Sequence, residues 1–170
     1  MNNTGIVTFA FGAPAGINSN IILARLTKVL AKELKELVVP IFTQFDIQLG
    51  LEPDLDVQRV KEVADQPPPT LRIARQAVKW AKQRNIKTLY VLAAKPHLWR
   101  ALRDIKQAIR ESGEERNIEI RTYGRAEQLP KDSWFCPDST QERVRSRKAW
   151  NKREWLLKIL PFWIYKKIAS

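Results

Sequence analysis

The side chains best suited to chemistry in this sequence are a histidine and an arginine three residues apart. His97 is the single histidine of the chain, and Arg100 follows it. In a helix, this spacing places both side chains on one face. An imidazole can exchange a proton, and a guanidinium can hold a carboxylate or phosphate. We interpret His97 as the candidate catalytic residue, an acid–base or polarising group. Arg100 is then the charge clamp for an anionic ligand, needed for binding rather than for stability.

The elements that must position these side chains follow an alternating pattern. Apolar runs typical of buried strands occur at 6–11, 38–47, 88–94 and 118–123, with amphipathic helical patterns between most of them. Successive β-α-β units build a parallel sheet covered by helices. The sequence therefore predicts an α/β fold, a Rossmann-like three-layer α/β/α sandwich with a short, mainly parallel sheet. A single domain is expected over 1–170, with a C-terminal helix at about 139–168 packing on it.

The candidate ligand-binding residues follow from this architecture, because parallel sheets bind ligands beyond the carboxyl ends of their strands. Three expected strand ends are followed by Gly12, Asp46 and Lys95. Thr70 is expected to cap a further helix, with Arg72 in the first turn. The predicted ligand-binding residues are Gly12, Asp46, Thr70, Arg72, Lys95, His97 and Arg100.

Basic side chains at two expected helix N-termini also point to an anion. Arg72 and Arg75 follow Thr70, while Lys95 and Arg100 flank the start of the next helix. A cation near a helix N-terminus is unfavourable by roughly 0.3–1 kcal/mol. A bound anion would offset this cost, and so would acidic side chains from the segment 52–65. The same positive dipole end is expected to keep the imidazole of His97 neutral.

Other catalytic signatures are missing from the sequence. The loop 12–16 lacks the Lys-Ser/Thr pair of a P-loop and the spacing of a dinucleotide-binding fingerprint. Cys136 precedes a proline and has no histidine near it in sequence, which argues against a nucleophilic cysteine. Glu52, Asp54 and Asp56 match no calcium-loop pattern, so no metal site is predicted. No cofactor follows from the residues themselves.

The net charge of +12 is concentrated in the second half of the chain. Residues 71–170 contain 24 Lys and Arg side chains against 10 Asp and Glu, whereas residues 1–70 contain 6 against 8. A basic half attracts anionic small molecules, nucleic acid or anionic membrane surfaces. The lone cysteine excludes a disulfide scaffold, and no apolar run approaches the ~20 residues of a membrane span. We expect a cytoplasmic protein; its oligomeric state is not indicated.

Two segments outside these units have their own patterns. Between 48 and 69, an acidic stretch precedes Val57, Val60 and Ala64, which fit a short helix that ends at Pro67-Pro68-Pro69. Near the C-terminus, Ser139 and Glu142 have the spacing of a capping box and are expected to open the last helix. We expect the apolar segment 155–164 to pack on the α/β core, because an exposed segment of this kind would leave a large hydrophobic patch.

The chain resembles the YdcF/SanA/ElyC-like family, a domain of unknown function. The resemblance spans most of the chain and is specific between about 65 and 103, where Thr70, His97, Arg100 and Ala101 match, with Gly12 as a weaker match. The tail segment 154–157 is similar to the family's Glu followed by an aromatic-aliphatic stretch. The sequence departs from the family at Arg72-Ile73, where members carry Glu-Asn, and at 67–69, where they carry Ser-Arg. The resemblance implies a Rossmann-like fold and a pocket near His97. It also makes S-adenosylmethionine a candidate cofactor, since some members are similar to proteins that bind it.

Three functions compete at this stage. The first is a site for a small anionic ligand, nucleotide-like or S-adenosylmethionine-like, at the carboxyl edge of the sheet. The second is a degenerate, non-catalytic family member that acts as a structural or partner-binding protein. The third is a basic protein whose C-terminal half makes weak, non-specific contact with nucleic acid or an anionic membrane, using tail arginines and lysines with Trp150 and Trp155. The sequence does not decide whether the protein is an enzyme.

Overall fold

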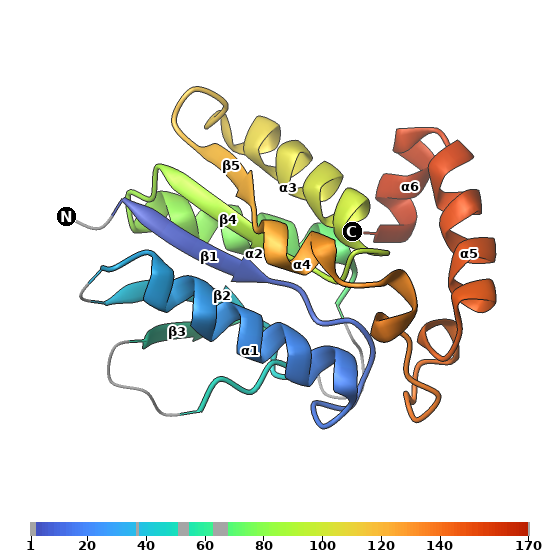
Figure 1. Ribbon diagram of the computed structural model, residues 1–170. Helices are drawn as coiled ribbons and strands as arrows, with labels where there is room; N and C mark the ends of the chain where they lie inside the picture. Colours follow the sequence, from blue (N-terminus) through green and yellow to red (C-terminus); the bar gives the residue numbers. More distant parts are fainter. Residues whose placement is uncertain (1–2, 37, 51–54, 63–67, 170) are drawn as a thin grey trace.

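A five-stranded, all-parallel sheet organises the chain, as the computed structural model shows for residues 3–36, 38–50, 55–62 and 68–169 (Figure 1). The strand order is β3-β2-β1-β4-β5. Helices flank the sheet, so the predicted α/β/α sandwich is confirmed. The strands are β1 (Thr4–Thr8), β2 (Val39–Thr43), β3 (Leu55–Arg59), β4 (Thr88–Leu92) and β5 (Glu119–Thr122).

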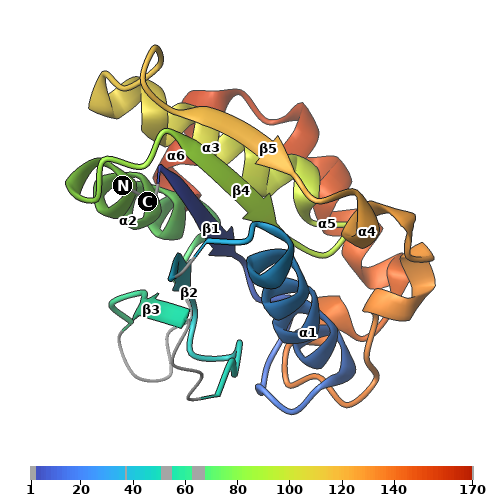
Figure 2. The ribbon, with the colours of Figure 1, turned by 60° about the vertical axis from the view of Figure 1, so that its left-hand side comes forward.

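Helices cover both faces and one end of the sheet. Figure 2 shows α1 on one side of the strands and α2 and α3 on the other. Helices α5 and α6 lie at the end toward which the strand arrows point (Figure 1). The helices are α1 (Asn18–Glu33), α2 (Thr70–Gln83), α3 (Leu98–Ser112), α4 (Gly124–Gln128), α5 (Arg147–Ile159) and α6 (Phe162–Ala169), with short 3-10 turns at Lys131–Trp134 (η1) and Glu142–Val144 (η2). None of the helices described is long and apolar enough to cross a bilayer.

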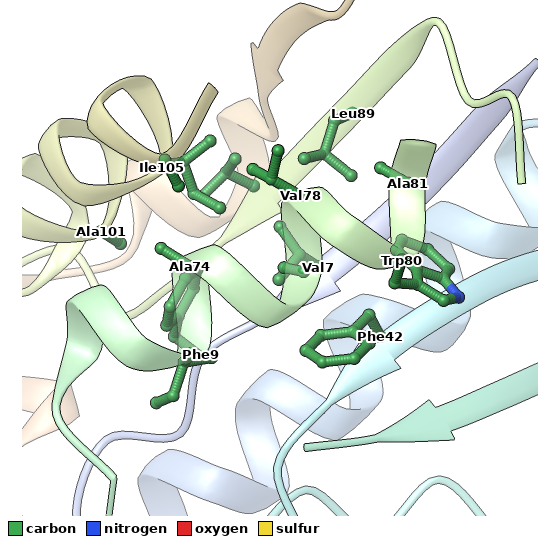
Figure 3. Close-up of a cluster of buried hydrophobic side chains, with 14 of the residues drawn as sticks. Val7, Phe9, Phe42, Ala74, Val78, Trp80, Ala81, Leu89, Ala101 and Ile105 are labelled. Carbon is green, nitrogen blue, oxygen red and sulfur yellow. The ribbon is translucent and has the colours of Figure 1, made fainter. Parts of the chain in front are cut away.

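Each face of the sheet has its own hydrophobic core. On one face, Ala74, Val78 and Ala81 of α2 pack over Val7 of β1 and Leu89 of β4 (Figure 3). On the other face, α1 contributes Leu23, Leu30 and Ala31 to a second cluster that also contains Trp134 and Trp150. The central strands β1, β2 and β4 are therefore covered on both sides, which explains their continuous apolar sequences.

The site of the topological switch lies between β1 and β4. The chain builds β2 and β3 on one side of β1 and then returns to place β4 and β5 on the other. Residues Thr8 and Leu92 are paired partners at the carboxyl ends of these two strands. The loop beginning at Phe9 and the loop that leads to His97 therefore leave the sheet side by side, at the position where such folds form ligand crevices.

The segment predicted as a short helix through Val57 and Val60 is instead strand β3. Val57 pairs with Ile41 of β2, and the backbone N–H of Val60 continues the pairing by donating to the Thr43 carbonyl at 2.8 Å. The alternation of Leu55, Val57 and Arg59 fits this extended structure, and the neighbouring β2 overrides the weak helical spacing. Four residues named above for this segment lie outside the described residues: Glu52, Asp54, Ala64 and Pro67.

Two predicted helix caps are wrong. Thr70 is the first residue of α2 rather than its cap; Pro69 precedes the helix, and no side chain caps it. The single C-terminal helix predicted at about 139–168 is two helices, α5 and α6, and the first of them, α5, does not begin at Ser139. It begins at Arg147, where the Ser146 hydroxyl accepts a hydrogen bond from the Ala149 backbone at 3.3 Å. Ser139 instead holds the loop after β1, since its hydroxyl donates to the Ala13 carbonyl at 3.1 Å.

Candidate functional site

A small cavity lies beyond the carboxyl ends of β1 and β4, with a volume of about 50 Å³. Five of the seven predicted ligand-binding residues line it together. They arrive on separate elements: the loop after β1, the loop after β2, the start of α2 and the start of α3. These residues are Gly12, Asp46, Thr70, His97 and Arg100.

His97 is enclosed at the centre of this cavity wall. Its side chain packs against the rings of Phe9, Phe11 and Trp150, with centroid separations of 6.0, 6.2 and 5.7 Å. Its Nε2 lies 3.3 Å from the Thr70 hydroxyl, while Nδ1 is buried without a hydrogen-bond partner among the described residues. Burial, and then the charges of nearby arginines, hold the pKa of His97 well below its usual value. The imidazole is therefore neutral at pH 7, as predicted, although burial rather than a helix dipole is the main cause.

Arg100 is buried and already has an acidic partner. Its Nη1 lies 2.9 Å from Oε1 of Glu154 in α5, and the two side chains are only 8% and 6% exposed. The guanidinium also lies over the Trp150 ring, 5.1 Å from its centroid. Burial lowers the pKa of Arg100 and raises that of Glu154, so taking these charges out of water opposes their ionisation. Arg100 thus links α3 to α5, and its charge is largely balanced within the protein.

Arg143 of η2 supplies the cavity with a second guanidinium. It is half-buried, and no carboxylate of the described residues lies within 4.0 Å of its guanidinium. Its Nη2 donates a hydrogen bond to the Gln141 side chain at 2.8 Å. Burial first, and then the positive charges of Arg153 and Arg100, lower the pKa of Arg143 to about 10. A partly desolvated cation beside two others favours a neutralising anion.

The loop after β1 forms another part of the wall and is closely fitted to η2. Gly12 has a φ of +92°, and a Cβ there would lie 2.8 Å from both Ile17 Cδ1 and Ser139 Oγ. Asn20 of α1 fixes the same loop, because its side chain accepts from the Phe11 N–H at 3.0 Å and donates to the Gly12 carbonyl at 3.1 Å. Only glycine fits this turn, so Gly12 has a structural reason for its place in the cavity wall.

An acidic side chain lies on the β2 side of the cavity. Asp46 is partly buried, and burial raises its pKa. Burial also raises the pKa of Glu62, and the nearby charge of Asp46 raises it further. The cavity lining therefore includes one carboxyl group, from Asp46, and two guanidinium groups, from Arg100 and Arg143. No cluster of three or more His, Cys, Asp or Glu side chains in the described ranges is arranged to hold a metal ion.

The other two predicted ligand-binding residues do not line the cavity. Arg72 is exposed on α2. Lys95 lines a separate hollow of about 160 Å³, with Trp150 between the two spaces. Side chains project in every direction around a helix, so the position of Arg72 two residues after Thr70 did not show whether its side chain faces the cavity or solvent. Arg75, the other arginine near the start of α2, is paired with an acidic side chain of the protein itself. It forms a salt bridge of 2.7 Å with Glu111 of α3.

The C-terminal segment contributes a part of the cavity wall that was not among the predicted ligand-binding residues. Gln141, Arg143, Val144 and Trp150 all line the cavity, more than 40 residues beyond His97. Their role depends on a long-range contact that no local spacing reveals. One signal was present: Glu154 is the single acidic residue of 143–170, and a lone carboxylate in a basic apolar segment is well suited to a buried cation.

These features define a Rossmann-like α/β domain with a small, basic, histidine-containing cavity at its topological switch point. Comparison with protein-family models finds no match, and no curated protein matches the sequence.

Proposed function

We propose that the protein binds a small anionic group, a phosphate or a carboxylate, in the cavity between Gly12, His97 and Arg143. The observation that carries this proposal is the charge imbalance of the cavity wall. Arg100 is balanced by Glu154, whereas Arg143 lies partly buried beside Arg100 without a carboxylate partner within 4.0 Å in the described structure. An anion beside Arg143 would offset the cost of removing that charge from water.

Neutral His97 suits the same ligand. A neutral imidazole has one N–H donor and one acceptor nitrogen. If Thr70 satisfies Nε2, the unpartnered Nδ1 is the nitrogen left to hydrogen-bond a ligand. With Nε2 as acceptor from the Thr70 hydroxyl, Nδ1 carries the proton and donates to an anionic oxygen. This arrangement supports binding and polarisation of a ligand; it does not by itself require a reaction.

The size of the cavity restricts what enters it. A volume of about 50 Å³ suits one phosphate-sized group, whereas pockets that enclose a whole small-molecule ligand are roughly 300–1,000 Å³. A nucleotide-like ligand would therefore insert a phosphate and S-adenosylmethionine its carboxylate, with the rest of each molecule outside. The family resemblance at Thr70, His97 and Arg100 is compatible with either ligand and remains a prediction.

The test is a titration of the purified protein with inorganic phosphate, adenosine monophosphate and S-adenosylmethionine, followed by calorimetry and thermal unfolding. Loss of one charge-assisted hydrogen bond, worth about 1.5–3 kcal/mol, should weaken binding roughly tenfold or more in Arg143→Gln. Arg116→Gln removes the same charge from an exposed turn and serves as the control. Equal affinities in wild type and Arg143→Gln, or no binding of any of the three probes, would refute the proposal.

A further inference from the structure

Among the described side chains of the last two helices, four large hydrophobic ones are exposed. Trp155, Leu156 and Ile159 of α5 are 66%, 49% and 57% exposed, and Trp163 of α6 is 65% exposed. We call these four residues the apolar patch. Positions 155, 156 and 159 share one face of α5, because residues separated by four lie one above the other on a helix. The prediction that the segment 155–164 packs on the α/β core is wrong for these four residues.

The packing of α5 and α6 on the domain does not need the apolar patch. Leu157 and Tyr165 are buried with Leu71 of α2, and Tyr165 donates a hydrogen bond to buried Asp104 of α3. Trp150 closes the cavity and Glu154 balances Arg100. The inner faces of both helices are thus fully used, and the apolar patch lies on what remains outside.

The exposed charges that α5 and α6 themselves carry are of one sign, although Arg147 and Lys166 form ion pairs with Asp132 of η1 and Glu111 of α3. Helices α5 and α6 contain seven Lys and Arg side chains and one acidic side chain, Glu154, which is buried against Arg100. Lys148, Lys152 and Lys167 are exposed, and the ammonium of Lys167 lies 5.8 Å from the centre of the Trp163 ring. The outward surface therefore combines tryptophan and aliphatic side chains with cations.

We propose that the outward face of α5 and α6 binds the surface of an anionic lipid bilayer, lying in the interface without crossing it. Tryptophan is favoured at the boundary between headgroups and acyl chains, and lysine stems bury along apolar material while their ammonium groups reach anionic headgroups. Lysine and arginine side chains next to the membrane are attracted to the negative surface potential of anionic bilayers.

The same features disfavour other occupants of this face. A second copy docked through a two-fold axis would bring the same cations against one another, which is repulsive. Single-stranded nucleic acid would use the cations and stack on the tryptophans, but it offers no apolar contact for Leu156 and Ile159. A bilayer with anionic headgroups satisfies the aliphatic, aromatic and cationic side chains together.

The experiment measures binding of the full chain to vesicles of phosphatidylcholine alone and of phosphatidylcholine mixed equally with phosphatidylserine. Co-sedimentation and tryptophan fluorescence report binding. We expect binding to the anionic vesicles, weakened roughly tenfold in Trp155→Ser/Ile159→Ser, because less apolar area is buried in the interface. Phe45→Ser/Ile21→Ser removes exposed hydrophobic side chains elsewhere, at 58% and 45% exposure, and should bind as wild type does.

Two control experiments test the folding of the variants and the independence of vesicle binding from the proposed anion site. All four substituted side chains are exposed, so thermal unfolding should confirm that both double variants fold. Arg143→Gln should leave vesicle binding unchanged, since this inference does not rest on the anion site. The proposal is overturned if the protein binds both kinds of vesicle equally, or if Trp155→Ser/Ile159→Ser binds vesicles as wild type does. It is also overturned if the protein binds oligonucleotides but not vesicles, or forms a dimer that this double variant dissociates.

Discussion

The buried Arg100–Glu154 pair gives the sharpest quantitative prediction about this protein. Glu154→Gln keeps the side-chain volume but removes the negative charge beside a guanidinium that is only 8% exposed. Breaking a buried ion pair by removing one partner costs about 3–5 kcal/mol, because the remaining charge is left uncompensated away from water. We expect about 3 kcal/mol, the lower end, since the dipole of the glutamine carbonyl still places a partial negative charge beside the Arg100 guanidinium.

A loss of about 3 kcal/mol is a large part of a total stability of ~5–15 kcal/mol. At roughly 2–4 °C per kcal/mol for a chain of this size, the midpoint of thermal unfolding should fall by about 6–12 °C. The measurement is urea unfolding followed by circular dichroism, with calorimetry for the midpoint. The exposed pair Glu119–Arg121 has the same N–O distance of 2.9 Å, with exposures of 58% and 51%, so Glu119→Gln is a matched control. That control should lose less than about 1 kcal/mol.

The double variant Arg100→Met/Glu154→Leu separates the cost of an unpaired charge from that of lost contacts. Replacing both charges by apolar side chains of similar volume should recover most of the stability lost in Glu154→Gln. If Glu154→Gln unfolds at the same urea concentration as wild type, Arg100 is not an uncompensated buried charge in that variant and the reasoning fails. A double variant that is less stable than Glu154→Gln would also contradict it.

Two further predictions concern the loop after β1 and the acid stability of the fold. Gly12→Ala should lower the free energy of unfolding in urea by about 2–5 kcal/mol, because φ is positive at this position and the new Cβ would lie 2.8 Å from Ile17 and Ser139. Gly113→Ala is the control, since Gly113 also has a positive φ but a Cβ there would lie in open space; it should cost about 1 kcal/mol. Equal losses of stability in the two variants would contradict the steric explanation. The bond from Arg75 lowers the pKa of Glu111 to about 2 in the folded protein, so its contribution to stability is present above pH 4.5 and is lost as the pH falls toward 2. Glu111→Gln should flatten that part of the stability profile, and an unchanged profile would show that the Arg75 interaction does not persist in solution.

The three central strands were predictable because they are buried on both faces. Runs such as 88–94 are continuous apolar segments that only a covered parallel strand explains. The strand ends then placed Gly12, Asp46 and His97 at one edge, where the structure brings them together. The edge strand β3 was not predictable in this way, since half-buried Leu55 and Val57 alternate too briefly to distinguish a strand from a helix turn.

The role of Arg100 illustrates the limit of local spacing. From the sequence, Arg100 is expected to bind the ligand and to matter little for stability. In the structure, its guanidinium forms an ion pair with Glu154, which is 54 positions away. We therefore expect the loss of Arg100 to lower stability. Arg143, which is free of a carboxylate partner among the described residues, takes the ligand-facing role in our proposal. Spacing along one helix cannot show which of two arginines finds an acidic partner on another helix.

The dependence of the α3 charges on α5 and α6 has a consequence for how the protein is synthesised. Ribosomes make β1 to β5 before Glu154 and Tyr165, so a nascent chain can form the parallel sheet while Arg100 and Asp104 still lack these partners. Such an intermediate must keep both charged groups hydrated, which leaves the carboxyl end of the sheet open to water. Trp150 of α5 is the last residue of the chain to join the cavity lining, so the wall of the proposed anion site is complete only after α5 has been synthesised and has docked.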